Sequence, residues 1–291
     1  MLEMAELSEG VYWVRGSPST LVVLDGERGY VVDPGSSRER GKDMRKALER
    51  LGVRRVEVVL THGHPDHVLA LGTLKPERVY ATGYEAVATG SLAFRNWSSF
   101  SFPFHRQSDI LLFRAGEEKV TDLIRAGDRV GPLEIVPLPG HTYGQIGVHI
   151  DGILYAADSI FGDRLLKRVG VPFFQDHRLA MKTMRGLTKY ECVVVSHGPL
   201  VRGEEVKQLV DQNIKWLEML EGLVRKLLIR TLSVDELTLS VLRELGAETS
   251  PPYLMLAATT LRSIVAMLYD EGEVEPVCTE DGLKWVIPGR T

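Results

Sequence analysis

The chain has 291 residues, of which 44% are hydrophobic and 25% charged, and its formal net charge is −4. This is an ordinary globular composition, large enough for a full α/β core and a second small unit. The acidic N-terminus lacks the features of a signal peptide, and no apolar run approaches the roughly 20 residues that span a bilayer, so we expect a cytoplasmic protein without a membrane partner. The two cysteines, Cys192 and Cys278, do not form the pattern of a disulfide framework.

Short apolar runs near the start of the chain predict a β-meander. These runs, 11–14, 20–24 and 30–32, are separated by segments with glycine-containing turn chemistry. Residues 42–51 then place apolar side chains at helical spacing and stop at a glycine. A strand, a loop and a short helix follow, so we expect a βαβ arrangement.

The loop directly after the apolar run 56–60 is rich in side chains that bind metals. Its sequence is Thr61-His62-Gly63-His64-Pro65-Asp66-His67, and it contains three of the chain's eight histidines. Left empty, three imidazoles and a carboxylate would repel each other or compete for water, whereas a divalent cation satisfies all four at once. We therefore expect a metal site formed by His62, His64, Asp66 and His67.

An aromatic segment over residues 92–113 follows. It holds six Phe or Trp side chains with basic residues between them, and it is too polar and serine-rich for a core strand. One interpretation is a flap that gives the metal site a hydrophobic wall. The other is a loop that packs its aromatic rings onto the domain or onto a second subunit.

Three later apolar runs each lead to another residue that can bind metal. The runs 133–138, 153–157 and 192–196 read as buried strands. Loops at one edge of a layered α/β sheet are where ligands gather, so we expect these strand ends to converge on the first loop. They would add His141, Asp158 and His197. Five imidazoles and two carboxylates exceed the three or four protein ligands of one zinc, which favours two adjacent metals with one bridging carboxylate.

From Glu204 onward the pattern becomes helical. Apolar residues recur at three- and four-residue steps over 204–228, Ser233 and Glu236 form a capping box for a second helix, and two prolines precede a third. A hairpin over 274–287 completes an order that resembles a winged-helix module. Residues 204–291 carry 15 acidic and 9 basic side chains, the wrong balance for binding phosphates, so we do not expect a nucleic-acid partner. We expect a structural cap or a homodimer contact.

Taken together, the motifs resemble those of the metallo-β-lactamase superfamily. The resemblance rests on the loop 61–67, Pro139-Gly140-His141-Thr142, Ala157-Asp158 and Ser196-His197-Gly198, in this order, with Val31-Val32-Asp33-Pro34-Gly35 as a first motif. It spans about residues 10–203. It implies an α+β fold, a four-layer αβ/βα sandwich in a catalytic domain over 1–203, followed by the small helical, winged-helix-like domain over 204–291.

The resemblance also implies how the ligands divide between two metals. One metal would be held by His62, His64 and His141. The other would be held by Asp66, His67 and His197, with Asp158 between the two. We expect zinc at both sites, with manganese or iron as alternatives, because the ligands alone do not select among these metals. The side chains expected to fix the ligand orientations are Asp33, Thr61 and Ser196.

Metal-activated water points to hydrolysis, and Asp66 is the carboxylate that we expect to orient this water or move a proton. The leading hypothesis is a hydrolase of a small ester, thioester or lactone, resembling the glyoxalase II and lactonase branches. The alternatives are a phosphodiesterase or ribonuclease, and a mono-iron oxidoreductase of the persulfide dioxygenase type. A fourth hypothesis is a regulatory protein with a relic metal site. Candidate substrate contacts are Trp97, Tyr143, Arg164, Phe174 and His177.

Overall fold

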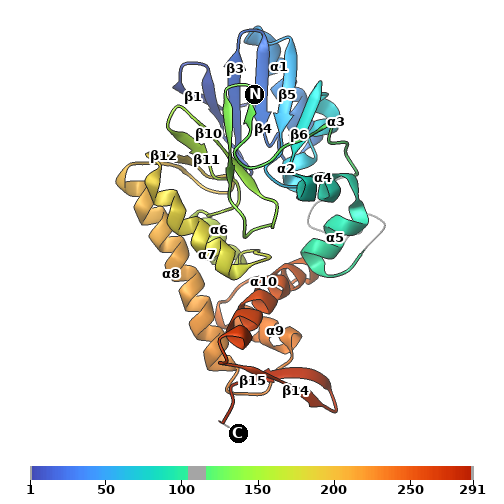
Figure 1. The fold of residues 1–291 in the computed structure, drawn as a ribbon, viewed down its shortest axis with the longest axis vertical. Coiled ribbons are helices and arrows are strands. Elements are labelled where there is room, and N and C mark those ends of the chain that lie inside the picture. The colour runs from blue at the N-terminus through green and yellow to red at the C-terminus, as the bar shows by residue number, and fades with distance from the viewer. Residues whose placement is uncertain (1, 104–115, 290–291) are drawn as a thin grey trace.

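A computed structural model describes residues 2–103 and 116–289. Two β-sheets pack face to face, and helices cover their outer faces, with a helical unit and a small hairpin at the C-terminal end (Figure 1). The α+β four-layer sandwich predicted from the sequence is therefore confirmed.

The first sheet combines an antiparallel half with a parallel half. Its first four strands pair antiparallel, and the fourth to the seventh pair parallel. Across the sheet, the strands lie in chain order: β1 (Met4–Ser8), β2 (Val11–Val14), β3 (Thr20–Asp25), β4 (Arg28–Val32), β5 (Arg55–Val59), β6 (Arg78–Ala81) and β7 (Asp122–Leu123). The predicted meander is confirmed. The edge strand β1 was not predicted; none of its residues is fully buried, and its sequence carries no continuous apolar run.

Helices cover the outer face of this sheet. The long helix α1 begins after Ser37, whose hydroxyl accepts a hydrogen bond from the Arg40 amide, and it buries Met44 and Leu48 against the sheet. The shorter helices follow the strands β5 and β6. They are α2 (Pro65–Val68), α3 (Leu71–Leu74) and α4 (Gly83–Gly90). The long helix α1 spans Arg38–Arg50.

The second sheet is antiparallel except for one parallel pair. That pair, β11 and β12, brings the ends of two separate chain segments to the same edge. In sheet order the strands are β13 (Leu200–Arg202), β12 (Cys192–Val194), β11 (Ile153–Tyr155), β10 (Ile146–Ile150), β9 (Leu133–Pro137) and β8 (Arg129–Val130). The inner faces of both sheets form one buried cluster that includes Leu21, Val148 and Tyr155.

The outer face of the second sheet shares its core with the C-terminal helices. The elements there are α6 (Asp163–Val169), α7 (His177–Gly186), η1 (Leu187–Lys189), α8 (Glu204–Leu227), α9 (Val234–Glu244), α10 (Pro251–Asp270), β14 (Glu275–Thr279) and β15 (Gly282–Val286). One buried cluster runs from Leu154 and Val193 in the sheet to Leu261 in α10. The order of three helices and a hairpin agrees with the sequence prediction, and the capping box at Ser233 is present.

The helix α10 would be long and apolar enough to cross a membrane by length and composition, with 44% of its most apolar window buried in the protein. It packs against α5 (Leu92–Phe100), α7, α8 and α9, so its apolar residues contribute to the shared core. Residues 92–100 of the aromatic segment form the helix α5, whose Phe100 lines a cavity, and residues 104–113 lie outside the described residues.

Candidate metal centre

Four strands end at one edge of the sandwich, and a candidate site residue follows each of them. Asp33 follows β4, Thr61 and His62 follow β5, Asp158 follows β11, and His197 follows β12. Strands β4 and β5 are parallel neighbours, as are β11 and β12, so the carboxyl ends within each pair lie together. These residues therefore meet although they are far apart in the sequence.

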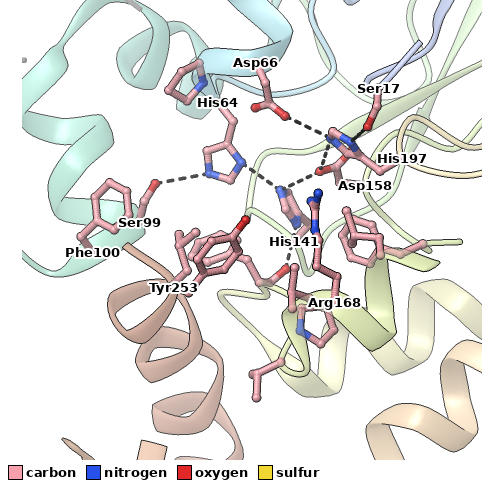
Figure 2. A pocket seen from close by; sticks show the side chains of 18 of the residues that line it. Ser17, His64, Asp66, Ser99, Phe100, His141, Asp158, Arg168, His197 and Tyr253 are labelled. Atoms are coloured by element: carbon pink, nitrogen blue, oxygen red, sulfur yellow. Dashed lines mark hydrogen bonds and ion pairs between the residues drawn. The ribbon is translucent and has the colours of Figure 1, made fainter. Parts of the chain in front are cut away.

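Five of the seven candidate ligands lie together in Figure 2, namely His64, Asp66, His141, Asp158 and His197, and the other two, His62 and His67, belong to the same cluster. His141 Nε2 is 2.9 Å from His64 Nδ1, and His197 Nε2 is 3.0 Å from Asp66 Oδ2. The Asp158 carboxylate lies between these pairs, with Oδ2 at 3.4 Å from His141 Nε2 and 3.6 Å from His197 Nε2. Each of two groups brings its ligand atoms within 4.8 Å of one another. The first group is His62, His64 and His141, and the second is Asp66, His67 and His197.

A buried carboxylate sets the orientation of one imidazole in each group. Asp33 accepts hydrogen bonds from the Thr61 amide (2.8 Å), the Thr61 hydroxyl (2.6 Å) and His67 Nδ1 (2.7 Å). Because the Thr61 hydroxyl donates to Asp33, it accepts from His62 Nδ1, which is 3.0 Å away. Both rings therefore carry a proton on Nδ1, which leaves Nε2 as the atom that can face a metal.

The other two imidazoles of the first group are oriented by different partners. His141 Nδ1 donates to the Phe173 carbonyl at 2.8 Å, which leaves Nε2 as the acceptor nitrogen. His64 is turned the other way, with Nε2 at 3.3 Å from the Ser99 hydroxyl and Nδ1 facing His141. The first group therefore presents three nitrogens whose opposite ring atoms are already engaged.

Hydroxyl groups support the side of the cluster formed by Asp158 and His197. The Ser17 hydroxyl lies 2.9 Å from His197 Nδ1, which leaves Nε2 facing Asp66. The Ser196 hydroxyl contacts Asp158 Oδ1 and the Ala157 carbonyl. Thr61, Asp33 and Ser196 thus contact candidate ligands as the sequence analysis expected, and Ser17 is an addition that it missed.

Two nitrogens in the cluster have unmet bonding capacity. Within the described part of the chain, His62 Nε2 and His67 Nε2 are buried and make no hydrogen bond, although His67 Nε2 lies 3.4 Å from Asp158 Oδ1. A buried polar atom without a partner costs free energy, and a metal ion at each nitrogen would remove that cost. One of these atoms belongs to each group, so the residues present fit two divalent metals.

Burial keeps the first group neutral. It lowers the pKa of His62 well below the ordinary value, lowers that of His64 to about 3, and lowers that of His141. Neighbouring imidazoles add to the effect at His62 and His64. Neutral imidazole is the form that binds metal, so this group is ready to bind without losing a proton.

The second group is dominated by its carboxylates. Burial opposes the charged imidazole, but Asp33, Asp158 and Asp66 together raise the pKa of His67 well above its ordinary value. Burial is likewise outweighed by Asp158 and Asp66 at His197, whose pKa is raised. Burial would raise the pKa of Asp66, yet His67 and His197 hold it at about 2. Without metal, this group holds protons that a metal must displace.

Glu85 is a buried carboxyl group that the sequence analysis missed. Its carboxyl accepts from the Gly63 amide at 2.8 Å and from the Thr142 hydroxyl at 2.6 Å, so it ties the first metal loop to the residue after His141. Burial raises its pKa to about 7. It stands in the first turn of α4, where an acidic residue is ordinary, so nothing in the sequence signalled its burial.

A cavity of about 470 Å³ lies beside the cluster. His64, Asp66, His141, Asp158 and His197 contribute to its lining. Its other walls come from α5, α6, the residues 171–173 and α10. The cavity therefore gives a small molecule access to the candidate metal centre, and the C-terminal unit forms part of it (Figure 2).

The five predicted substrate contacts do not line this cavity. Trp97 and Tyr143 are 56% and 55% exposed, because α5 turns its other face to the cavity and Tyr143 lies outside the lining. Arg164 is also exposed, whereas Phe174 and His177 are buried. His177 Nε2 instead lies 2.7 Å from a carboxylate oxygen of α8. Arg168, one turn after Arg164 in α6, is the basic residue of that helix that reaches the cavity.

Known proteins are similar in sequence to part of this chain. It is 27% identical over 138 residues to a hydroxyacylglutathione hydrolase from Methylobacillus flagellatus, a match that covers 45% of this chain and 43% of the relative. A probable metallo-hydrolase from Methanocaldococcus jannaschii is 26% identical over 152 residues, which cover 50% of this chain and 69% of that protein. The chain thus spans less than half the length of the hydroxyacylglutathione hydrolase that it matches.

Solved structures resemble the whole chain. A beta-lactamase domain protein from Burkholderia ambifaria superposes with a TM-score of 0.70 at 19% identity, covering 98% of this chain and 93% of that one. A metallo-beta-lactamase family protein from Thermus thermophilus gives 0.69 at 16% identity, covering 97% and 100%. At these identities the likeness shows the fold alone. The model of the metallo-beta-lactamase superfamily matches residues 12–198, which include every candidate ligand, so the chain belongs to that superfamily.

Proposed function

We propose that this protein is a hydrolase that uses two divalent metal ions, with a thioester or a related small ester as its substrate. The observation that carries the proposal is the pair of ligand groups on either side of Asp158, each with a buried imidazole Nε2 atom that makes no hydrogen bond. Membership of a superfamily of metal-dependent hydrolases supports the same chemistry.

The two groups would hold one metal each, and Asp158 would contact both. His62, His64 and His141 would bind the first, and Asp66, His67 and His197 the second. When bound, two such metals lower the pKa of a shared water and polarise the bond to be hydrolysed. Zinc suits a set of imidazoles and carboxylates, which makes it our proposed ion at both positions.

Asp66 would orient the attacking water rather than store its proton. Its carboxylate faces the cavity, and its pKa of about 2 keeps it ionised at neutral pH. An efficient general base has a pKa near the working pH, and Asp66 lies far below it. An ionised carboxylate remains a strong hydrogen-bond acceptor, which suits the orienting part of the role that we assigned to it.

Two observations favour a thioester or ester among the substrates that such a site hydrolyses. Relatives named hydroxyacylglutathione hydrolase match the metal-binding half of the chain. Most of the surface of the cavity is apolar, which suits an acyl group better than a phosphodiester. The acidic C-terminal unit, which forms part of the cavity, further disfavours an oligonucleotide.

The test combines metal analysis with a panel of substrates. We expect two zinc ions per chain by elemental analysis, and hydrolysis of an acyl thioester well above that of a lactone, a phosphodiester or a short single-stranded RNA. Asp66→Asn should lower kcat by at least about a hundredfold, since it removes a charged ligand and water acceptor. One iron per chain, or thioester hydrolysis unchanged by Asp66→Asn, would contradict the proposal.

A further inference from the structure

Apolar side chains form much of the cavity wall, and α5 also contributes the polar residues Arg95, Asn96 and Ser99. Side chains from α5, α6, the segment after α6 and α10 form this surface, and the principal ones are Phe100, Phe161, Leu165, Val169, Phe173 and Leu256. A surface of this kind binds a hydrocarbon or aromatic group by removing it from water.

Arg168 is the basic side chain that α6 contributes to these walls. Its side chain is exposed, it lines the cavity, and it makes no hydrogen bond or ion pair with any described residue. Figure 2 shows its guanidinium group directed toward the end of the cavity where His141 and Asp158 lie. The other lining arginine, Arg95, is buried and donates to the carbonyl groups of residues 88 and 89.

The carboxylates of the lining do not neutralise Arg168. Those among the described lining residues are Asp66 and Asp158, and both contact imidazoles of the metal centre. Arg168 therefore borders the cavity without a carboxylate partner among the described residues. An anionic group on the bound molecule would provide the missing partner, through charge-assisted hydrogen bonds to a planar donor.

The helix α10 contributes one polar group to the same space. Tyr253 and Leu256 stand three residues apart, on one face of the helix, and both line the cavity. The Tyr253 hydroxyl has no hydrogen-bond partner in the described part of the chain and points toward the metal centre in Figure 2. Both residues lie beyond the stretch matched by the superfamily, so this wall belongs to the part of the chain that the superfamily model leaves out.

We infer that the substrate is an amphipathic monoanion: an acyl thioester or ester whose apolar body lies between α5, α6 and α10 and whose single anionic group pairs with Arg168. This inference rests on the proposed function for the reaction, and it adds the class of molecule that the site accepts. The apolar walls select the body, Arg168 selects the charge, and Tyr253 donates a hydrogen bond to a polar atom near the metal centre.

The test measures binding rather than turnover, so it does not depend on the reaction. The probes are two thioethers with the same eight-carbon chain, which cannot be hydrolysed; one ends in a carboxylate and the other in a carboxamide. We expect the metal-loaded protein to bind the carboxylate about tenfold more tightly by calorimetry, the size of one charge-assisted contact at a partly exposed site. Arg168→Ala should abolish this preference and leave the affinity for the carboxamide unchanged.

Arg164→Ala is the matched control, because Arg164 is an exposed arginine of the same helix that does not line the cavity. It should keep the preference for the carboxylate. Equal binding of both probes by the wild type would overturn the inference. So would a preference that survives Arg168→Ala, since the carboxylate would then be bound by the metals. An active thioesterase with either result would leave the proposed function intact, whereas an inactive protein with the expected binding would contradict only that function.

The apolar part of the inference has its own readout. Affinity for the carboxylate thioethers should rise as the chain is lengthened from four to eight carbons, because each methylene buried against the walls contributes about 0.8 kcal/mol in transfer free energy, or about fourfold in Kd. Leu256→Trp, which fills part of the cavity from α10, should remove the gain for the longer chains while keeping the preference for charge. Affinity independent of chain length in the wild type would refute this assignment of the walls.

Discussion

Asp33→Asn is the substitution that tests most directly how the metal centre is organised. Asp33 is fully buried, and its two oxygens accept three hydrogen bonds, two from Thr61 and one from His67. Asparagine has nearly the same shape and tolerates the positive φ of 53° at this position, so the backbone has no reason to move. The substitution therefore removes only the second carboxylate oxygen and the negative charge, so its effects report on these two properties.

The expected magnitude follows from these hydrogen bonds. In either orientation, the amide NH₂ of asparagine faces a buried donor, so at least one donor loses its acceptor at a cost of about 1–3 kcal/mol. Loss of the charged acceptor for His67 Nδ1 adds about 1–2 kcal/mol. We expect the unfolding free energy to fall by about 3 kcal/mol. His67 would also lose the partner that keeps its proton on Nδ1, so affinity for the second metal should fall by about ten- to a hundredfold.

Urea unfolding and metal titration of the same preparations measure both effects. Glu57→Gln is the matched control, because Glu57 is a buried carboxylate on β5 that accepts a hydrogen bond from the Tyr80 hydroxyl at 2.7 Å, away from the candidate ligands. It should lose stability but keep two metals per chain. If Asp33→Asn binds both metals with wild-type affinity, the carboxylate does not control His67 and the reasoning is refuted.

Three further predictions follow from other parts of the site. The second metal should bind more tightly as pH rises and should release protons from His67 and His197, whose pKa values are raised, whereas the first metal should bind without such release. Calorimetry in buffers of different ionisation enthalpy measures the protons released, and equal release at both sites would show that this is wrong. Because the folded-state pKa of Glu85 is raised to about 7, its protonated form contributes stability at low pH that is lost between about pH 4.5 and 7. Over this range the unfolding free energy of the metal-free wild type, measured in urea, should fall by about 3 kcal/mol relative to that of Glu85→Gln. Parallel pH profiles of the two proteins would count against this prediction. Gly140→Ala should lower the unfolding free energy by about 3 kcal/mol and displace His141, since the new Cβ would lie 2.5 Å from the Ala180 backbone at a φ of +136°. Wild-type stability together with wild-type binding of the first metal would contradict this prediction.

The candidate ligands could be predicted from the sequence because their signal is local. The loop 61–67 concentrates imidazoles that only a shared cation satisfies. Each later ligand follows a run that reads as a strand, directly at Asp158 and His197 and after two residues at His141. Strand type and strand end are both visible in the sequence. Parallel pairing then places the end of β4 beside that of β5, and the end of β11 beside that of β12. The meander and the three C-terminal helices were visible for the same reason, through the period of their apolar residues.

The substrate contacts depended on information that the sequence does not carry. Arg164 and Arg168 differ by one helical turn, and the docking of α6 against the cavity decides which of them reaches it. The prediction that Trp97 contacts substrate was wrong for a related reason. A loop was expected where α5 forms, and the orientation of that helix directs the indole to solvent. Glu85 has no local signal, since its burial results from contacts with two loops that are distant in the sequence.

The same contrast explains why the superfamily alone does not identify a substrate. The match over 12–198 includes all seven candidate ligands, so it carries the chemistry of the centre. The cavity wall includes Tyr253 and Leu256 from α10, which is held in place by a hydrogen bond from Thr259 to the Ser99 carbonyl of α5 and one from Thr260 to the Pro172 carbonyl. Relatives that share the ligands but not α10 would present the same metals to a different space. Specificity in this chain therefore has to be tested at α6 and α10, because substitutions at the metal ligands would remove every activity alike.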